Sequence, residues 1–457
     1  MLDIHSGDVT LHPETLTDKI RNKTARICIV GLGYAGLPTA VAFAEKGFDV
    51  LGADIDEDKV EMINRGESPI RDLILDNRLI ELEKSIQATT DIASAVSESD
   101  VVSIVVPTPV TEAKEPDLSY VFSASQSVSR GLKKGQLIIL ESTTYPGTTE
   151  EVVKPVLEES GLRTPEDFGL GYCPERFNPA DPDHTMEKMT RIASANSEEW
   201  AQVVKALFES IVREIVLVRN IKTAEAAKVV ENAQRDLNIA LMNELALIFE
   251  RMGIDVIDVI EAASTKWNFI EMYPGPGVGG HCLPVDPYYL THKSRELGYD
   301  PRVILAGRYV NSLMPDHAVS LVENGLKEVG KSIDGSEIAI LGLAFKPNIG
   351  DMRESPSVEI AQKLKEGRAN VRVHDPMVEN EAVQKILKLE NMPLESALEG
   401  ADCVIITTDH DRIREIAIEQ IQSLAKDGCV LVDTRNVFNP DRIPEGMVYR
   451  GIGRIRF

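Results

Sequence analysis

The sequence predicts an α/β protein in which two doubly wound domains are joined by a central helical domain with one long helix. Three observations lead to this prediction. Short apolar runs alternate with helical stretches over residues 25–220, the same alternation returns near the C-terminus, and the region between them is rich in helix formers. We therefore expect α/β domains at 25–220 and 326–457, a helical domain at 221–325 and an N-terminal arm at 1–24.

The first α/β domain is expected to begin with a buried parallel strand at 25–30, where the sequence reads Ala-Arg-Ile-Cys-Ile-Val. A glycine-rich turn, a helix to Lys46 and a second strand at 49–53 follow. Apolar runs predict further strands, at 101–106, 137–140 and 215–218. The polar arm that precedes the domain shows no clear period, and the sequence leaves its order open.

The central domain is expected to begin with a long helix from Thr223 to Met252, which Gly253 ends. The second α/β domain repeats the scheme of the first. Its predicted strands lie at 337–341, 371–374, 402–407 and 429–433, and a helix begins near Ser355.

The composition excludes several function classes. The 457 residues carry 73 acidic and 49 basic side chains, which gives a net charge of −24. Such a chain repels nucleic acid and anionic lipid, so we expect neither as a partner. No apolar run approaches membrane-spanning length, so we expect no transmembrane segment. The N-terminal residues Met1–Ile4 do not begin the basic and then apolar stretch of a secretion signal. Five cysteines, an odd and small number, favour a reduced, cytoplasmic location.

A dinucleotide fingerprint follows the first predicted strand. It reads Gly31-Leu32-Gly33-Tyr34-Ala35-Gly36 and opens a helix. The first glycine permits a tight turn, the second lets a pyrophosphate approach the backbone, and the third lets the helix pack on the strand. Asp54 ends the second strand, 23 residues after Gly31, where its carboxylate can accept from ribose hydroxyls and would repel a 2′-phosphate. We therefore predict a Rossmann-like domain that binds NAD; a merely structural glycine turn is the alternative.

Two threonines lie just past predicted strands of this domain, in Val106-Pro107-Thr108-Pro109 and Glu141-Ser142-Thr143. The carboxyl ends of parallel strands line the ligand crevice of an open sheet, so Thr108 and Thr143 are candidates for contact with the nicotinamide side of the cofactor. Ordinary loop threonines remain an equal alternative.

One cysteine differs from the others in its surroundings. Cys282 lies in a Pro/Gly-rich loop at 274–287, whereas the other four lie in or beside apolar strands. Exposed backbone N–H groups in such a loop can lower the pKa of a thiol, which favours a nucleophile over an inert structural thiol. Asp286 lies four residues further on and could activate a water. No CxxC, HxxxH or HExxH pattern occurs, so we expect no metal site.

The long helix carries three polar residues on one face. Lys228, Asn232 and Arg235 follow one another at i, i+4 and i+7 on an otherwise largely apolar helix. A lysine beside an asparagine suits stabilisation of an oxyanion. A solvated face of the helix is the alternative interpretation.

Together these residues resemble the nucleotide-sugar 6-dehydrogenases, the UDP-glucose/GDP-mannose dehydrogenase family, over nearly the whole chain after Arg26. The resemblance rests on five motifs in order: Gly31–Gly36, Pro174-Glu175-Arg176, Lys228-x-x-x-Asn232-x-x-Arg235, Gly279-Gly280-His281-Cys282, and the stretch from Phe345 to Pro356. It implies an NAD-binding domain and a nucleotide-sugar-binding domain joined by a long dimerisation helix, and hence a homodimer or dimer-based oligomer.

The resemblance also implies a reaction and roles for residues. The C6 hydroxyl of a UDP-sugar would be oxidised to a carboxylate with two NAD⁺, through a thiohemiacetal and a thioester on Cys282. Lys228 and Asn232 would stabilise oxyanions, and Asp286 or Glu175 would activate water. Arg353 would reach the cofactor, and Lys59 falls where several relatives carry arginine near the adenosine. The implied substrate contacts are Arg176, Phe177, Arg235, Lys266, Gly279, Phe345, Lys346 and Arg435.

The sequence of the loop around Cys282 narrows the range of expected substrates. UDP-glucose and GDP-mannose members usually carry Cys-x-Pro-Lys-Asp, whereas Val285 stands at the lysine position here. The loop resembles that of dehydrogenases acting on UDP-N-acetylhexosamines, first of all UDP-N-acetyl-D-mannosamine. UDP-N-acetylglucosamine, UDP-N-acetylgalactosamine and UDP-glucose are the alternative substrates. A plain two-electron dehydrogenase or a non-catalytic NAD-sensing or nucleotide-sugar-binding scaffold are the other hypotheses, and neither needs the Cys282 thiol.

Overall fold

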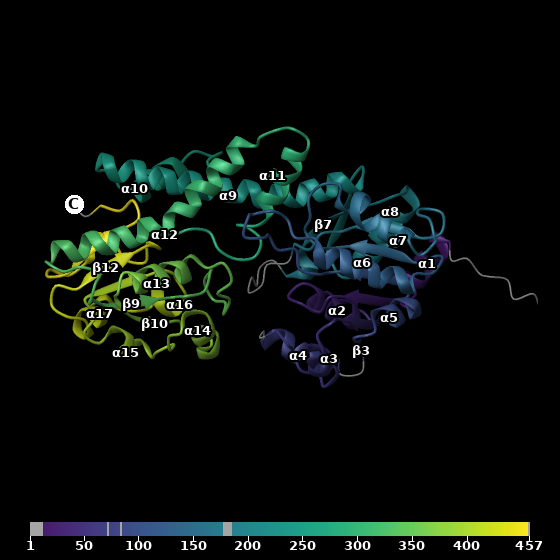
Figure 1. Cartoon of the computed structure of the whole chain (residues 1–457), viewed down its shortest axis with the longest axis horizontal. Coiled ribbons are helices and arrows are strands. Elements are labelled where there is room, and N and C mark those ends of the chain that lie inside the picture. The colour runs from purple at the N-terminus through teal and green to yellow at the C-terminus, as the bar shows by residue number, and fades with distance from the viewer. Residues whose placement is uncertain (1–11, 71–72, 83–84, 177–184, 456–457) are drawn as a thin grey trace, which may run out of the picture. The chain divides into compact units, whose positions relative to one another are not determined.

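The computed structural model describes residues 12–70, 73–82, 85–176 and 185–455, and the chain forms two compact units. Unit 1 consists of Met1–Val230 and Tyr288–Leu297, and unit 2 consists of Glu231–Pro287 and Gly298–Phe457. Figure 1 colours unit 1 mainly purple to blue and unit 2 mainly green to yellow. The three boundaries expected from the sequence, between the arm and the three domains, stay predictions.

Unit 1 contains an eight-stranded sheet in the order β3-β2-β1-β4-β5-β6-β7-β8. Neighbouring strands are parallel, except that β6 and β7 are antiparallel. The strands are β1 (Arg26–Val30), β2 (Asp49–Ala53), β3 (Ile86–Thr89), β4 (Val101–Ile104), β5 (Leu137–Leu140), β6 (Gly169–Tyr172), β7 (Thr190–Ala195) and β8 (Glu214–Leu217).

Helices cover both faces of this sheet (Figure 1). In β1, Ile27 and Ile29 belong to one buried cluster and Cys28 and Val30 to another, because successive side chains of a strand point to opposite faces. A strand buried on both faces reads as a continuous apolar run, as predicted. The helices are α1 (Pro13–Arg21), α2 (Gly36–Glu45), α3 (Glu57–Asn64), α4 (Leu73–Glu81), α5 (Ile92–Glu98), α6 (Ser119–Gly131), a π-helical turn η1 (Thr149–Val153), α7 (Lys154–Glu158), a 3₁₀ turn η2 (Met186–Lys188) and α8 (Glu198–Phe208).

Two parts of unit 1 go beyond what the sequence predicted. The described end of the N-terminal arm forms helix α1, whose Leu16 and Ile20 are buried in the same cluster as Trp200. Strands β3 and β7 were not predicted, because their sequences lack long apolar runs, and of β6 only the end beside Cys173 was expected. In β6 a glycine is required: a Cβ at Gly169 would lie 2.3 Å from the Trp200 ring, so α8 packs where a side chain would stand.

Unit 2 contains a five-stranded parallel sheet in the order β10-β9-β11-β12-β13. Its strands are β9 (Glu337–Leu341), β10 (Asn370–His374), β11 (Cys403–Ile406), β12 (Val430–Asp433) and β13 (Val448–Gly451), the last of which was not predicted. The helices that lie wholly in this unit are α10 (Val256–Ser264), α12 (Arg302–Glu328), α13 (Pro356–Glu366), α14 (Asn380–Leu387), α15 (Leu394–Leu398), α16 (Asp411–Arg414), α17 (Ile418–Leu424) and the 3₁₀ turn η3 (Pro440–Arg442).

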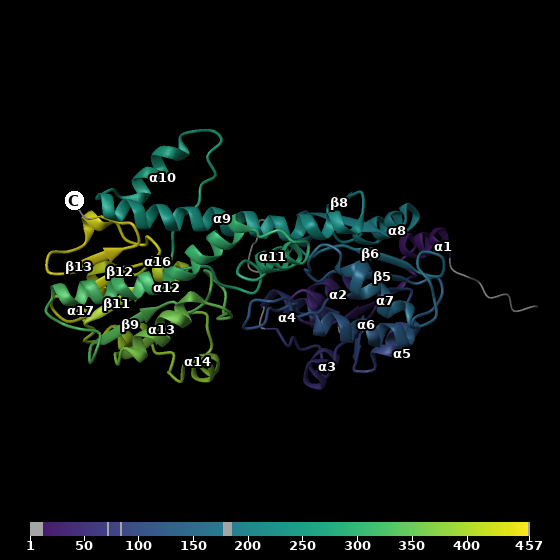
Figure 2. The same cartoon turned by 45° about the horizontal axis from the view of Figure 1, so that its top comes forward.

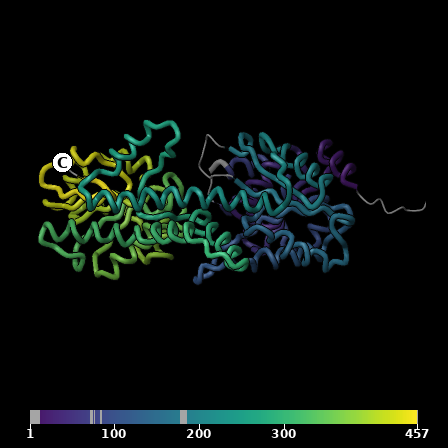
Figure 3. The backbone as a smooth tube through the Cα atoms, turned by 90° about the horizontal axis from the view of Figure 1, so that it is seen from above, coloured from purple at the N-terminus to yellow at the C-terminus, as the bar shows by residue number. Residues whose placement is uncertain are grey.

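The predicted long helix is α9 (Ile221–Met252), which begins in unit 1 and continues in unit 2 (Figure 2). Gly253, at φ +70°, follows its last residue, as expected for a helix end. Within unit 2, α12 packs on α9, and Figure 3 follows the backbone through both helices. Arg308 and Asn311 of α12 both donate to the buried Asp236 carboxylate of α9, at 2.5 and 2.8 Å.

Candidate active site

The glycine-rich loop between β1 and α2 has the geometry that its sequence predicts. Gly31 has φ +99°, and its N–H donates to Ala53 O at 2.7 Å. A Cβ at Gly36 would lie 1.8 Å from Gly31 O, so the third glycine allows close packing. Gly33 has no atom within 4 Å of its would-be Cβ. The second glycine therefore faces open space just before the N-terminus of α2, where Ala35 is the N-cap and Tyr34 is 45% exposed.

Asp54 lies directly after β2 and is tied to this loop. Its carboxylate accepts from Leu32 N–H at 2.7 Å and from Asp56 N–H at 3.0 Å. Lys59 Nζ lies 3.7 Å from Asp54 Oδ2. The sequence-predicted acid, the glycine-rich loop and Lys59 therefore lie together at the carboxyl ends of β1 and β2.

Thr108 and Thr143 follow β4 and β5, which are neighbours in the sheet, and both threonines are half-buried. The Ser142 hydroxyl links their loops, since it accepts from Val106 N–H at 3.0 Å and donates to Val106 O at 2.7 Å. In this sheet the strand order reverses between β1 and β4, and open α/β sheets bind ligands at such a point. Both loops are on the edge expected for a cofactor.

Glu175 and Arg176 follow β6, and a buried arginine that the sequence analysis missed holds this segment. The Arg191 side chain is 0% exposed and bonds to the Glu141 carboxylate at 2.7 Å. It also donates to Cys173 O and Pro174 O, and its Nη1 lies 3.2 Å from Glu175 Oε2. Glu175 is thus one partner of a buried ion-pair cluster. Phe177, the next predicted substrate residue, lies outside the described residues.

The Cys282 loop belongs to unit 2 and leads into helix α11 (Asp286–Glu296). Cys282 O accepts from Val285 N–H at 3.0 Å and from Asp286 N–H at 2.8 Å, so the cysteine stands at the start of the first helical turn. Asp286 is 3% exposed, and its carboxylate accepts from the Asn232 side-chain amide of α9. A thiol at a helix start lies near the positive end of the helix dipole.

The other cysteines have a different environment. Cys28, Cys173, Cys403 and Cys429 are at most 1% exposed, whereas Cys282 is half-buried. Burial raises the pKa of Cys28, Cys173 and Cys429 to about 12, and it raises that of Cys403 well above the usual value. These four thiols stay protonated at neutral pH, so Cys282 is the accessible thiol.

Several predicted substrate residues of unit 2 lie around this loop. A Cβ at Gly279 would lie 2.8 Å from Phe345 Cβ, and Gly280 N–H donates to Arg353 O at 3.1 Å. Lys346 is half-buried beside Phe345. Arg435 donates to Thr407 O at 3.1 Å, and its Nη1 lies 3.0 Å from a Cβ built on Gly275. The loop thus packs against the segments after β9 and β12.

The remaining candidates are more scattered. On α9, Lys228 is 9% exposed and Asn232 is half-buried, whereas Arg235 is exposed. Lys266, which follows α10, is also exposed. The Arg353 guanidinium is paired with Asp351. The predicted polar stripe of α9 is therefore buried at its N-terminal end and solvated at Arg235.

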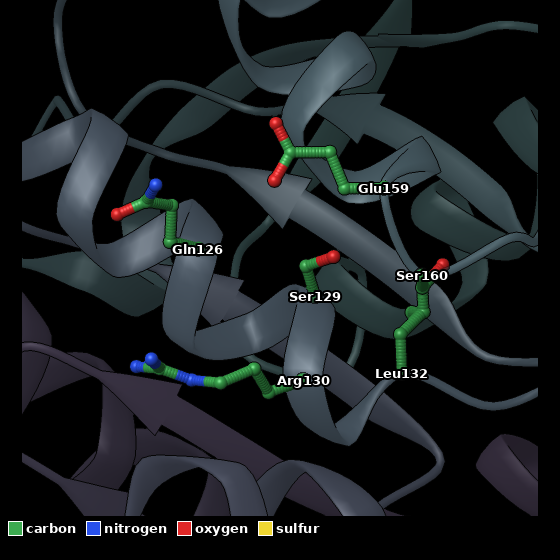
Figure 4. Close-up of a pocket in the computed structure, with 6 residues that line it drawn as sticks. All are labelled: Gln126, Ser129, Arg130, Leu132, Glu159 and Ser160. Atoms are coloured by element: carbon green, nitrogen blue, oxygen red, sulfur yellow. The ribbon is translucent and has the colours of Figure 1, made fainter.

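Other possible sites are weaker. Over the described parts of the chain, no three His, Cys, Asp or Glu side chains are grouped to hold a metal ion, and no helix is long and apolar enough to cross a membrane. A surface pocket in unit 1 lies beside the end of α6 and the turn after α7 (Figure 4) and contains none of the predicted site residues. Its lining is Gln126, Ser129, Arg130, Leu132, Glu159 and Ser160.

Comparison with protein families finds three matches along the chain. Residues 25–212 match the NAD binding domain of the UDP-glucose/GDP-mannose dehydrogenase family, 222–313 match its central domain, and 339–440 match its UDP binding domain. The fingerprint loop lies in the first match and the Cys282 loop in the second.

Individual proteins are similar over nearly their whole length. The chain is 41% identical over 424 residues to a UDP-N-acetyl-D-glucosamine 6-dehydrogenase from Pseudomonas aeruginosa, covering 92% of this chain and 99% of that protein. It is 36% identical over 430 residues to a UDP-N-acetyl-D-mannosamine dehydrogenase from Pyrococcus horikoshii, covering 94% and 99%. A solved structure of a UDP-D-ManNAc dehydrogenase from Pyrococcus horikoshii matches with a TM-score of 0.86 at 36% identity, covering 94% of this chain and 99% of that one.

Proposed function

Because this chain belongs to the UDP-glucose/GDP-mannose dehydrogenase family and is an NAD-dependent nucleotide-sugar dehydrogenase, we propose that it oxidises C6 of a UDP-N-acetylhexosamine to the carboxylate. The main support is the Cys282 loop, which presents an accessible thiol one turn before Asp286. An enzyme that stopped at the aldehyde would need no such nucleophile.

The cofactor is assigned to unit 1. Open space at Gly33, the N-terminus of α2 and the Asp54 carboxylate fit a diphosphate and the hydroxyls of an adenosine ribose. Tyr34, Ala35, Lys59, Thr108, Thr143 and Arg353 are proposed further contacts of the cofactor. When bound, NAD accepts one hydride in each of two oxidation steps.

The proposed covalent chemistry belongs to Cys282. Its sulfur adds to C6 of the aldehyde, forming a C–S bond, and the resulting oxyanion is stabilised by Lys228 and Asn232. Oxidation of this adduct leaves a thioester. Water then adds to the thioester carbon and the C–S bond breaks, which releases the carboxylate and returns the thiol. The overall change consumes the alcohol, two NAD⁺ and one water, and yields the carboxylate, two NADH and three protons.

Asp286 is the proposed base that takes a proton from this water. The alternative, Glu175, is held in an ion pair with the fully buried Arg191. Phe345, Lys346, Arg435 and Gly279 are the proposed contacts to the UDP-sugar in unit 2, with Arg176, Phe177, Arg235 and Lys266 as additional ones. A dimer and a cytoplasmic location are part of the same proposal.

Two sugars are favoured by specific observations. UDP-N-acetyl-D-mannosamine, the substrate expected from the loop sequence, is supported by the Pyrococcus relative, and UDP-N-acetyl-D-glucosamine is supported by the Pseudomonas relative at 41% identity. The two differ only in configuration at C2. The test is to incubate the purified protein with NAD⁺ and, in separate reactions, with each of these two sugars, UDP-N-acetylgalactosamine and UDP-glucose. With one of the three acetylated sugars, the protein should produce two NADH per sugar consumed. One NADH per sugar, or faster turnover of UDP-glucose, would contradict the proposal.

A further inference from the structure

The segment that follows β9 carries Phe345 and Lys346 and is held from one side by the loop that follows β11. Both lie within the match to the UDP binding domain. Thr408 Oγ1 donates to Ala344 O at 2.5 Å, and Asp411 N–H donates to Asn348 Oδ1 at 3.1 Å. Asn348 itself has φ +62°, in the left-handed region, which asparagine adopts more readily than most other non-glycine residues.

The central residue of this contact is His410, which is 1% exposed. Its Nδ1 lies 2.9 Å from Asn348 N, and its Nε2 lies 3.1 Å from Asp375 Oδ2. A backbone N–H can only donate, so Nδ1 must be the acceptor and carries no proton. The ring proton therefore resides on Nε2 and is donated to Asp375.

Asp375, directly after β10, binds the other end of the same segment. Its Oδ2 accepts from Leu343 N–H at 2.6 Å and from Ala344 N–H at 3.0 Å. Burial acts to raise the pKa of Asp375, but the bonds from His410 and from backbone N–H groups outweigh it and hold the pKa below its usual value. The pair His410–Asp375 thus fixes residues 343–344 and residue 348 at once.

We propose that His410 is a positioning residue for the UDP-sugar, because its Nδ1 holds Asn348 and thereby keeps Phe345 and Lys346 in the conformation that binds substrate. This inference rests on the proposed function, in which these two residues contact the UDP-sugar. Holding the segment before substrate arrives removes an ordering cost from binding. His410 therefore acts on affinity, and the chemical steps at Cys282 do not depend on it.

Two substitutions test the roles of the two ring nitrogens of His410 one at a time. In His410→Asn the amide oxygen takes the place of Nδ1 and can accept from Asn348 N–H, but the side chain does not reach Asp375. In His410→Gln the amide nitrogen takes the place of Nε2 and can donate to Asp375, but the acceptor for Asn348 is lost. Each variant removes one hydrogen bond. The bond lost in His410→Asn goes to the charged Asp375, so this variant should lose at least as much stability as His410→Gln.

The two variants should differ in their affinity for the UDP-sugar. His410→Gln should raise the KM for the UDP-sugar, and the dissociation constant for UDP measured by calorimetry, by about tenfold, the factor expected for one lost hydrogen bond of ordinary strength. His410→Asn should stay within about threefold of the unchanged protein. In both variants kcat and NAD binding should be nearly unchanged. His374→Asn, which removes the ring that contacts Met392 O in the same domain, is the matched control and should leave KM unchanged.

Equal changes of KM in the two His410 variants, in step with their melting temperatures, would mean a merely structural histidine and would overturn the inference. An unchanged KM in both variants would do the same. If the unsubstituted protein bound no UDP at all, the proposed function would fail instead, so the two failures are distinguishable.

Discussion

The Asn232 side-chain amide donates a hydrogen bond to the Asp286 carboxylate, although 54 residues separate them in the chain. Asn232 lies on the long helix α9, and Asp286 opens α11 one turn after Cys282. This bond joins a proposed oxyanion-stabilising residue to the proposed base. The orientation of both therefore depends on the packing of the Cys282 loop against α9 in unit 2.

The choice between two bases can be tested with neutral isosteres. Asp286→Asn should lower kcat by about a hundredfold or more, since a positioned general base contributes that much. Glu175→Gln should have a smaller effect on the hydrolysis step, because Glu175 is paired with Arg191. Rapid quench followed by mass spectrometry should detect a sugar adduct on Cys282 only in Asp286→Asn. A larger adduct in Glu175→Gln would assign the base to Glu175.

The thiol itself should be indispensable for acid formation. Cys282→Ala is expected to lower the rate of carboxylate production by about a thousandfold or more, as loss of a covalent nucleophile does in other enzymes. Binding of NAD, which is assigned to unit 1, should be unchanged in fluorescence titrations. Cys429→Ala, a change at a buried thiol of unit 2, serves as the control and should keep kcat. Full carboxylate formation by Cys282→Ala would refute the thioester step.

Two glycines of the fingerprint should respond differently to alanine. Gly33→Ala places a methyl group in open space, so the free energy of unfolding should change by less than about 0.5 kcal/mol, while NAD affinity should fall about tenfold or more. Gly36→Ala places its Cβ 1.8 Å from Gly31 O and should destabilise the protein by about 1–3 kcal/mol. Thermal melts and NAD titrations of both variants test this. Unchanged NAD binding in Gly33→Ala would contradict the proposal that the diphosphate of NAD binds at this loop.

Glu225 should make stability depend on pH. It is 0% exposed on α9 and accepts from Gly147 N–H, Thr149 N–H and the Thr149 hydroxyl. Burial raises the pKa of Glu225 from 4.5 to about 7. Between these values the folded state holds a proton that the unfolded state has lost, so this contribution is complete below pH 4.5 and is lost as the pH rises through about 7.

The loss corresponds to about 1.4 kcal/mol for each unit of pKa difference. Glu225→Gln cannot titrate and should remove this slope from denaturant unfolding curves recorded between pH 5 and 8. Glu166→Gln, which changes an exposed carboxylate of the same unit, should retain it. If the slope survived in Glu225→Gln, another group would be responsible.

The sequence predicted those features that local patterns encode. Strands β1 and β5 are continuous apolar runs because both of their faces are buried, and the turn at Gly31 follows from its spacing to Gly36. The accessible Cys282 was also recognisable, because its Pro/Gly-rich surroundings differ from those of Cys28.

Features that depend on distant partners were not predictable. In the sequence of β7, nothing distinguishes Arg191 from a solvent-exposed arginine of a strand. Only the fold brings Glu141, 50 residues away, to its guanidinium. His410 likewise meets Asp375 and Asn348 through tertiary packing alone. Of strand β6 only the end beside Cys173 was expected, because its glycines weaken the apolar signal, although Gly169 is needed to admit the Trp200 ring.

The contrast among the five thiols has a practical consequence. Because four sulfur atoms are shielded and stay protonated, iodoacetamide at neutral pH should alkylate each native polypeptide once, at Cys282. The fraction of intact protein that gains the mass of one alkyl group would then measure the fraction of molecules with a reactive Cys282. Binding of a nucleotide sugar at the proposed site could be followed as protection of Cys282 from the reagent, without any redox assay.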